Sequence, residues 1–337
     1  MAARMADVAA LAGVSQRTVS NVVSGYVHVR PETRERVQRA LDELKYRPNA
    51  SARSLRQGRT GIIALAVPYI AAPYFAELAD QIQQRAASRG ITLLMDQTGA
   101  DRQRELLVLD GYRTHVIDGL IFSPMAMTAQ DLRERDVGMP TVLLGERIRH
   151  GGLVNVAIDN VAASREAVKH LLDTGRRRIA LVGADLMTNH AGAAAGRLEG
   201  YHLAHRDAGV RVVPELSLTT DGWVLPSGYA AVTALVRRRI TVDALFCVND
   251  LLALGAIRAL NDHGLSVPGD VAVMGWDDIE EAKYSTPSLS SVSPDKAAIA
   301  EAAVARLVDQ IAGGPGVAQE VVCDYQLVIR ESTGPRG

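Results

Sequence analysis

Six polar side chains of the kinds that contact DNA stand close together near the start of the chain. They are Ser15, Gln16, Arg17, Thr18, Ser20 and Asn21. Arg pairs in bidentate fashion with guanine, and Gln or Asn with adenine, each such pair contributing roughly 1–3 kcal/mol of base discrimination. Hydroxyl groups and a helix N-terminus suit contacts with phosphate. From spacing alone, a small helical bundle with an ordinary polar face remains an alternative.

Three short helices are expected to position these side chains, over Asp7–Ala12, Gln16–Ser24 and Thr33–Lys45. Gly13 suits the tight turn that ends the first helix, and Ser15 is a favourable N-cap for the second. Val19, Val22 and Val23 recur at helical spacing and predict the buried face of the second helix. Helix, turn and capped helix together predict a helix-turn-helix, whose second helix enters a major groove.

Charge is divided unevenly along the chain. Residues 1–60 hold eleven Lys and Arg against five Asp and Glu, a net charge of +6, whereas the remaining residues carry −7 of the total −1. A small basic segment attached to an acidic one suits polyanion binding by the first segment alone.

From Gly61 onward, short apolar runs alternate with amphipathic helical stretches, which predicts βαβ units and parallel sheets covered by helices on both faces. About ten strands are many for one sheet, so two α/β lobes are expected. The predicted strands are 62–67, 91–95, 119–122, 141–144, 154–158, 178–182, 216–219, 244–248, 271–274 and 321–329. The main predicted helices are 74–89, 160–173, 193–207, 226–237, 250–263 and 295–311.

Motifs of several enzyme classes are absent from the sequence. There is no GxGxxG after the first strand, no Walker loop, no HExxH and no GxSxG, so we expect no catalytic residues and no cofactor. Cys247 and Cys323 lie in apolar runs and are expected to be buried thiols rather than metal ligands. No signal peptide or membrane span is recognisable, which favours the cytoplasm, in association with the nucleoid.

The run from Asp7 to Ser24, DVAALAGVSQRTVSNVVS, closely resembles the signature of the LacI/GalR family of bacterial repressors, as does the later stretch LKYRPN ending at Asn49. The resemblance extends over essentially the whole chain. It implies that residues 49–57 form a hinge helix that enters the minor groove when two subunits lie side by side on DNA. Asn49, Ala52 and Leu55 match its DNA contacts, with Leu55 as the wedge between base pairs.

Two positions depart from the family pattern. Arg4 stands where a Thr usually caps the first helix, and Arg30 where a Ser usually precedes Pro-Glu-Thr. Each exchange removes a cap, at a cost of roughly 1 kcal/mol, while adding positive charge near the expected path of the phosphates.

The resemblance also implies a two-lobed domain of periplasmic-binding-protein type that binds a small effector. The matching effector contacts are Tyr74, Phe75, Arg197, Trp223, Asn249 and Asp277. Plain structural roles remain open: Trp223 as core, Asn249 and Asp277 as helix caps, and Arg197 as a solvated or lobe-bridging ion. Glu146 occupies a position where many relatives carry a sugar-contacting Asp. A sugar or sugar derivative is the first expectation and a purine-type ligand the second.

The expected organisation is therefore a DNA-binding domain (1–46), a hinge (47–60) and an effector-binding and dimerisation domain (61–337). The first lobe is expected over about 61–160 and 291–322, and the second over about 161–290 and 323–330. We expect a homodimer on a near-palindromic operator, a repressor of sugar-utilisation genes released by a sugar-type inducer. A corepressor-dependent repressor with a purine-type ligand is the alternative. A solute-binding protein would need a signal peptide, and an α/β enzyme a nucleophile or cofactor loop.

Overall fold

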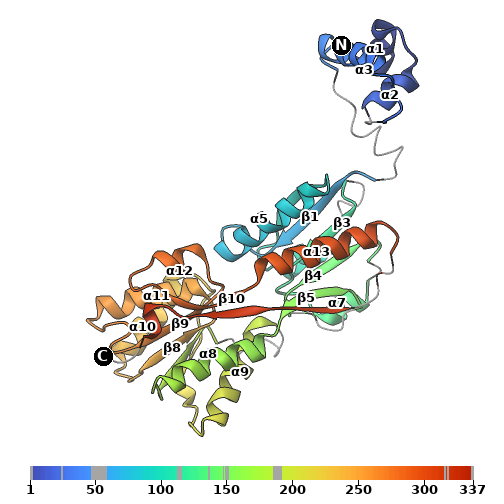
Figure 1. Ribbon diagram of the computed structural model, residues 1–337. Helices are drawn as coiled ribbons and strands as arrows, with labels where there is room; N and C mark the ends of the chain where they lie inside the picture. Colours follow the sequence, from blue (N-terminus) through green and yellow to red (C-terminus); the bar gives the residue numbers. More distant parts are fainter. Residues whose placement is uncertain are drawn as a thin grey trace. The chain divides into compact units, whose positions relative to one another are not determined.

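The computed structural model describes residues 3–23, 26–46, 59–111, 116–135, 137–146, 148, 152–184, 192–314, 316 and 319–334. Its contacts separate two compact units, Met1–Gly61 and Ile62–Gly337. We refer to the first as the head and to the second as the body, and describe each by itself (Figure 1).

The head contains helices α1 (Met5–Ala12), α2 (Gln16–Val23) and α3 (Pro31–Glu43). Its core lies where the three helices meet and consists of Val8, Ala9, Ala12, Val19, Val22, Val37, Ala40 and Leu41. Gly13 ends α1 in the left-handed region at φ 63°, which costs glycine little. Pro31 occupies the first turn of α3, where its missing N–H is not needed.

The body contains two six-stranded sheets, which define its two lobes. The first sheet has the order β11-β5-β4-β3-β1-β2 and only parallel pairs. Its strands are β1 (Ile62–Val67), β2 (Thr92–Gln97), β3 (Gly119–Phe122), β4 (Thr141–Leu144), β5 (Val154–Ile158) and β11 (Glu320–Cys323). Strands β3, β4 and β5 are completely buried, as expected for parallel strands covered on both faces.

The second sheet has the order β12-β10-β9-β8-β6-β7, and its β10–β12 pair is antiparallel. Its strands are β6 (Ile179–Val182), β7 (Ser217–Leu218), β8 (Ala244–Cys247), β9 (Ala272–Trp276), β10 (Ser290–Pro294) and β12 (Tyr325–Val328).

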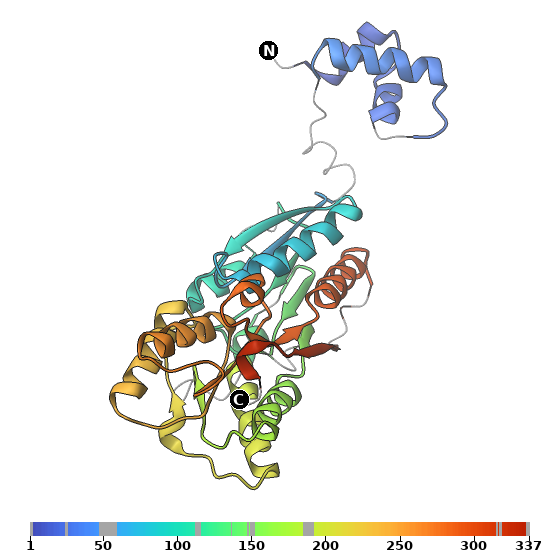
Figure 2. The same cartoon turned by 60° about the vertical axis from the view of Figure 1, so that its left-hand side comes forward.

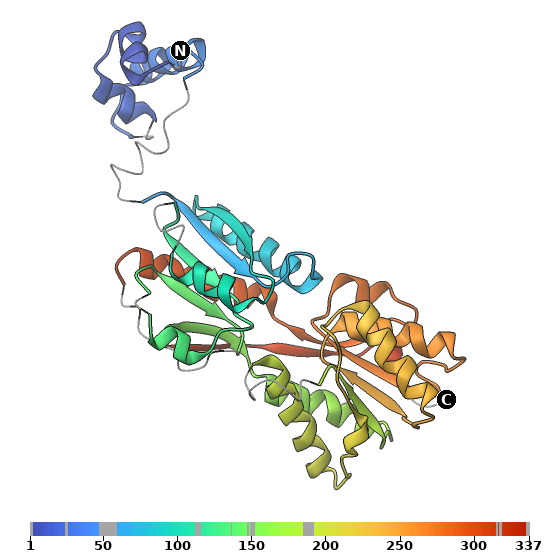
Figure 3. The ribbon, with the colours of Figure 1, turned by 180° about the vertical axis from the view of Figure 1, so that it is seen from behind.

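Helices cover both faces of each sheet. In the first lobe, α5 (Pro73–Ser88) and α13 (Lys296–Ile311) pack on one face, and α6 (Arg102–Leu109) and α7 (Ala129–Arg133) on the other (Figures 1 and 3). In the second lobe, α8 (Asn160–Asp173) packs against α9 (Ala193–Asp207), and α10 (Leu225–Arg237) against α11 (Asp250–Asp262). In Figure 2 the colours of these helices run from green at α8 through yellow to orange at α11. The short α12 (Glu280–Tyr284) follows β9.

The chain passes between the lobes at three places, and one of them differs from the expected boundaries. We expected residues 291–322 in the first lobe, but β10 stays in the second sheet through Pro294. We also expected one strand over 321–329. Instead β11 pairs with β5 of the first sheet as far as Cys323, and β12 joins the second sheet from Tyr325. Strand β10 was not predicted because its sequence, SSVSP, is mostly polar.

The serines of β10 are buried because their hydroxyls find partners. Ser291 Oγ donates to Asp250 Oδ1 at 2.7 Å, and Ser290 Oγ lies 2.7 Å from Thr333 Oγ1. Burial of a hydroxyl is tolerated when it is hydrogen-bonded, so a strand without apolar alternation can still lie inside the sheet. Within the described part of the chain, no helix is long and apolar enough to cross a membrane.

Candidate functional site

The start of α2 presents the side chains that the sequence predicts for DNA reading. Ser15 Oγ accepts a hydrogen bond from the Thr18 N–H at 3.1 Å and lies 2.9 Å from Thr18 Oγ1, so Ser15 is the N-cap of α2. Gln16 and Arg17 are exposed, whereas Val19 and Val22 on the opposite face are buried. The helix therefore offers an amide and a guanidinium group to solvent at its N-terminal end.

The other residues predicted to contact DNA are either less exposed than Gln16 and Arg17 or lie outside the described residues. Ser20 and Asn21 are half-buried along α2. Asn49, Ala52 and Leu55 lie outside the described residues, so the hinge stays a prediction.

The loop after α2 adds aromatic surface that the sequence analysis did not single out. Tyr26 and Val27 are 50% and 78% exposed, and the rings of Tyr26 and His28 meet edge to face with centroids 5.4 Å apart. The Arg34 guanidinium donates to the Tyr26 carbonyl at 2.8 Å and ties this loop to α3. The loop thus places two rings in a basic unit, and its short sequence, GYVHVR, has no helical periodicity that would single them out.

At the two positions that depart from the family pattern, Arg4 and Arg30, the side chain does not replace the hydrogen bond of the usual capping residue. The helices that follow Arg4 and Arg30 begin without a side-chain cap hydrogen bond. At α1 the contact runs the other way, because the Arg4 N–H donates to Asp7 Oδ2 at 2.8 Å.

In the body, close helix packing places Arg197. A Cβ at Gly200 would lie 2.4 Å from the Val161 carbonyl, so only glycine lets α9 approach α8 this closely. Ser164 Oγ of α8 donates to the Arg197 carbonyl at 2.6 Å. These contacts fix the backbone of α9 beside the N-terminus of α8.

The Arg197 side chain is 7% exposed and lies among aromatic and polar partners. Its Nε donates to Asn160 Oδ1 at 2.9 Å and its Nη1 to the Val248 carbonyl. The guanidinium carbon is 4.0 Å from the centroid of the Trp276 ring and 5.6 Å from that of Trp223. Burial lowers the pKa of Arg197, and the nearby carboxylates oppose this. Of its five N–H donors, these contacts use two.

Asp277 follows β9 at its carboxyl end, and its charge and that of Arg197 act on each other. Its backbone is in the left-handed region at φ 107°, as is that of Asp278 at φ 47°, conformations that persist only where the surroundings hold them. Burial raises the pKa of Asp277 to about 7 even though the charges of Arg197 and Lys296 lower it. The carboxyl group therefore changes its charge near neutral pH.

Asn249, at the carboxyl end of β8, has the structural role left open above. Its Oδ1 accepts from the Leu252 N–H at 2.9 Å and caps α11, while its Nδ2 donates to the Trp223 carbonyl at 3.0 Å. Asn249 thus holds the loop that carries Trp223, and the half-buried Trp223 ring packs against the core with its centroid 5.6 Å from the Arg197 guanidinium carbon.

Tyr74 and Phe75 enter from the first lobe at the start of α5. Their rings meet edge to face with centroids 5.2 Å apart. Burial raises the pKa of Tyr74, as do the charges of Asp277 and Glu146, whereas Arg197 lowers it. The predicted effector residues are therefore brought together, with Tyr74, Arg197 and Asp277 close enough to influence one another.

Three neighbours of this cluster were missed as functional candidates. Asn160 holds the Arg197 Nε, Trp276 lies beneath the guanidinium, and the fully buried Asp250 accepts from the Ile279 N–H at 2.9 Å. Burial and the charge of Asp277 raise the pKa of Asp250 well above its usual value. All three sit at or beside strand ends, which was the available signal, but a sequence does not say which strand ends meet.

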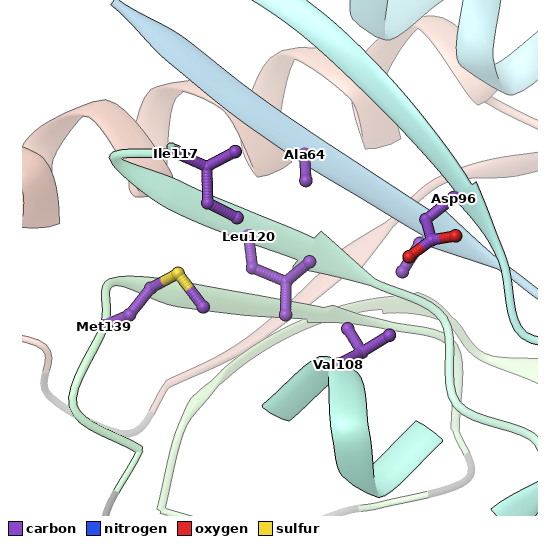
Figure 4. A pocket seen from close by; sticks show the side chains of 7 residues that line it. Ala64, Asp96, Val108, Ile117, Leu120 and Met139 are labelled. Carbon is purple, nitrogen blue, oxygen red and sulfur yellow. The ribbon is translucent and has the colours of Figure 1, made fainter. Parts of the chain in front are cut away.

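Two cavities of the body lie elsewhere, in the first lobe. One has a volume of only about 10 Å³, room for about one water molecule, and is lined by Ala64, Ala66, Asp96, Val108, Ile117, Leu120 and Met139 (Figure 4). The other is an open hollow beside Asp96 and Arg104. Neither involves the Arg197 cluster. Among the described residues, no group of His, Cys, Asp and Glu could hold a metal ion.

Comparison with known families identifies both units of the chain. A profile of bacterial regulatory proteins of the lacI family matches residues 4–49, and a profile of the periplasmic binding protein-like domain matches residues 168–333.

Individual relatives match over nearly the full length. The HTH-type transcriptional repressor PurR of Proteus mirabilis (strain HI4320) is 33% identical, over 98% of this chain and 96% of the relative. A solved transcriptional regulator CelR–cellobiose complex is 32% identical, covers 98% of this chain and 99% of its own, and has a TM-score of 0.71. The lac repressor dimer bound to operator and the anti-inducer ONPF is 26% identical over 99% of both chains, with a TM-score of 0.86.

Proposed function

This chain belongs to the lacI family of bacterial regulatory proteins and is a ligand-responsive transcriptional regulator, and we propose that it represses sugar-utilisation genes until a sugar-type inducer releases it from DNA. The observation that carries this proposal is the likeness to PurR and CelR over nearly the whole chain, head and body together. Each unit also has the chemistry its part requires, since exposed base-reading groups lie on α2 and a buried polar cluster lies in the body.

DNA recognition is assigned to the start of α2. Gln16, Arg17 and Asn21 read base edges, and Ser15, Thr18 and Ser20 contact phosphates. Residues 47–60 act as the hinge, with Leu55 as the wedge in the minor groove. The lac repressor is bound to operator as a dimer, which supports a homodimer of this chain on a near-palindromic site. Such a protein works in the cytoplasm, on the nucleoid.

The effector binds at the Arg197 cluster. Arg197 provides hydrogen-bond donors, and the Asp277 carboxyl group both donates and accepts when it is protonated. Such a set of groups is suited to the hydroxyl groups of a ligand. Trp223 offers the flat surface on which the C–H face of a sugar stacks. CelR binds cellobiose, which favours a sugar. A purine-type corepressor is the second candidate, because planar rings at Trp223, Tyr74 and Phe75 also suit a purine and PurR is among the relatives.

A salt titration tests the DNA-binding part. Duplexes selected from a random pool by the full-length protein should bind with log K falling linearly with log salt between about 50 and 200 mM. The absence of selected duplexes, or an affinity that salt does not change, would refute the function.

A thermal-shift screen tests the effector part. Cellobiose, ribose and the purine bases are each added to the wild type and to Arg197→Gln, and a ligand that binds the folded state raises Tm by mass action. We expect a sugar to raise the Tm of the wild type only. The selected DNA is then titrated with that ligand: a fall in affinity identifies an inducer and a rise a corepressor. A purine that raises Tm while no sugar does would favour the second candidate.

A further inference from the structure

A carboxylate on the first lobe reaches the backbone of the second. Glu77 lies on α5, one helical turn after Tyr74, and its Oε1 accepts from the N–H of Glu280, the first residue of α12, at 2.9 Å. Its Oε2 is 2.7 Å from the Lys296 ammonium. Helix α5 packs in the first lobe, whereas α12 follows β9 of the second sheet. One side chain of the first lobe therefore bonds a backbone group of the second lobe, beside the point where the chain crosses from β10 to α13.

The Lys296 ammonium makes a second connection of the same kind. Lys296 is the first residue of α13, which packs with α5 in the first lobe. Besides pairing with Glu77, its Nζ donates to the Asp278 carbonyl of the second lobe at 3.1 Å. The Lys296 side chain is only 13% exposed, and partial burial strengthens a charge-assisted contact compared with one on the open surface.

Both connections end on the same short turn, residues 277–280. Asp277 and Asp278 adopt left-handed backbone angles there, and Arg330 and Ser291 support the turn from within the second lobe through contacts of 2.6 Å to Asp278 Oδ1 and 3.0 Å to the Asp278 N–H. The charges of Lys296 and Glu77 both act on the Asp277 carboxyl group. The turn that carries an effector residue is thus also the point at which the first lobe holds the second.

We propose that Glu77 and Lys296 form a clasp on the 277–280 turn that stabilises the arrangement of the lobes seen here and sets how readily they separate. The pair is self-supporting, because each charge stabilises the other and each also bonds a backbone group of the second lobe. Separation breaks both bonds to the turn at once. An effector bound at Asp277 would act on this clasp through the 277–280 turn, and that link rests on the proposed function. The clasp itself does not.

Spin labels on the two lobes test the clasp without DNA or effector. Full-length protein carrying Gln83→Cys in the first lobe and Arg238→Cys in the second is labelled at these exposed positions, while the native Cys247 and Cys323 are buried. Pulsed dipolar spectroscopy then gives the distribution of distances between the lobes. Glu77→Ala and Lys296→Met should each increase the ratio of separated to joined lobes by about fivefold or more. The double variant should add little to either change, because the two residues act as one unit.

A matched ion pair provides the control. Glu301 of α13 pairs at 2.5 Å with Arg89, the residue that follows α5. Unlike the Glu77–Lys296 pair, these two side chains bond only groups of the first lobe. Glu301→Gln should leave the distance distribution unchanged. The clasp is refuted if Glu77→Ala and Lys296→Met give the wild-type distribution, or if Glu301→Gln changes it as much. A thermal unfolding scan of each variant confirms that the labels report on folded protein. DNA selection with the same variants distinguishes a failure of the clasp from a failure of the proposed function. If only the clasp is wrong, the protein still selects specific duplexes.

Discussion

The head and the body prepare for their partners in opposite ways. At the start of α2, Gln16 and Arg17 are exposed, and the described residues offer their side chains no hydrogen bonds. In the body, Arg197 is almost fully buried and already bonded to Asn160 and Val248. DNA brings its own charges and base edges to the protein surface, so the side chains that contact it can remain solvated in the free protein. A small ligand that must be held by a few groups needs those groups held in place beforehand.

The same contrast applies to the effect of substitutions on binding and on folding stability. An exposed reader contributes to binding and little to folding, whereas a buried charged group contributes to both, because removing it leaves its partners unsatisfied. Four variants test the contrast, from the largest expected effect to the smallest.

Replacement of Arg197 by Ala should cost the most. It leaves the Asn160 Oδ1 and the Val248 carbonyl without their donor and the neighbouring Asp277 without its cation, and loss of one member of a buried charged network costs about 3–5 kcal/mol. Denaturant unfolding of the body measures it. Arg165→Ala on α8 is the control, since the Arg165–Asp207 pair is largely exposed and should contribute less than about 1 kcal/mol. Equal losses for the two variants would contradict the contrast.

Replacement of Arg17 by Ala should have the opposite signature. We expect base preference to relax at one operator position by roughly 1–3 kcal/mol, with folding stability changed by less than about 0.5 kcal/mol. Selection of binding sites from random duplexes measures the first quantity and thermal unfolding the second. A selection profile identical to the wild type would show that Arg17 is not a reader.

Replacement of Asp277 by Asn should change how stability depends on pH. The folded-state pKa of Asp277 is raised to about 7 from an ordinary value of about 3.9. Between these values the folded protein binds a proton that the unfolded chain lacks, so stability falls with rising pH by up to about 1.4 kcal/mol per pH unit. The variant removes this loss, and its Tm relative to the wild type should rise from about pH 4.5 to about pH 7.5.

Asp262→Asn serves as the control of opposite sign for this measurement. Its hydrogen bond from Arg258 lowers the pKa of the exposed Asp262, so whatever stability it contributes is present at neutral pH and is lost as pH falls. If Asp277→Asn and the wild type keep the same Tm difference across the range, the Asp277 carboxyl group does not titrate as described.

Replacement of Ser15 by Ala should have the smallest effect, confined to the head. It removes the acceptor for the Thr18 N–H at the start of α2, at a cost of about 1 kcal/mol. Hydrogen exchange followed by mass spectrometry should show faster exchange in α1–α3 and unchanged exchange in the second sheet. Faster exchange throughout the body would mean that the two units do not unfold separately.

Local signals in the sequence were enough for the type and order of most elements. In the head, Gly13 ends α1 and Ser15 caps α2 as predicted, because both effects depend on neighbouring residues alone. In the body, the apolar runs mark most strands. The strand SSVSP was missed because the hydroxyls of Ser290 and Ser291 are satisfied by Thr333 and Asp250, which are distant in sequence.

What the sequence determined by itself is the kind of side chain available: amide and guanidinium groups at the N-terminus of one helix, and Arg, Asp, Asn and aromatic residues near strand ends. What only the tertiary structure decided is which of these groups meet. Asn160 accepts a hydrogen bond from Arg197, and the Asn249 amide bonds the Trp223 carbonyl and the N-terminus of α11. Glu77 and Lys296 bond the turn beside Asp277. Such pairings arise from packing between segments far apart in the chain, and burial then shifts the pKa of Asp277, which no local pattern of residues can specify.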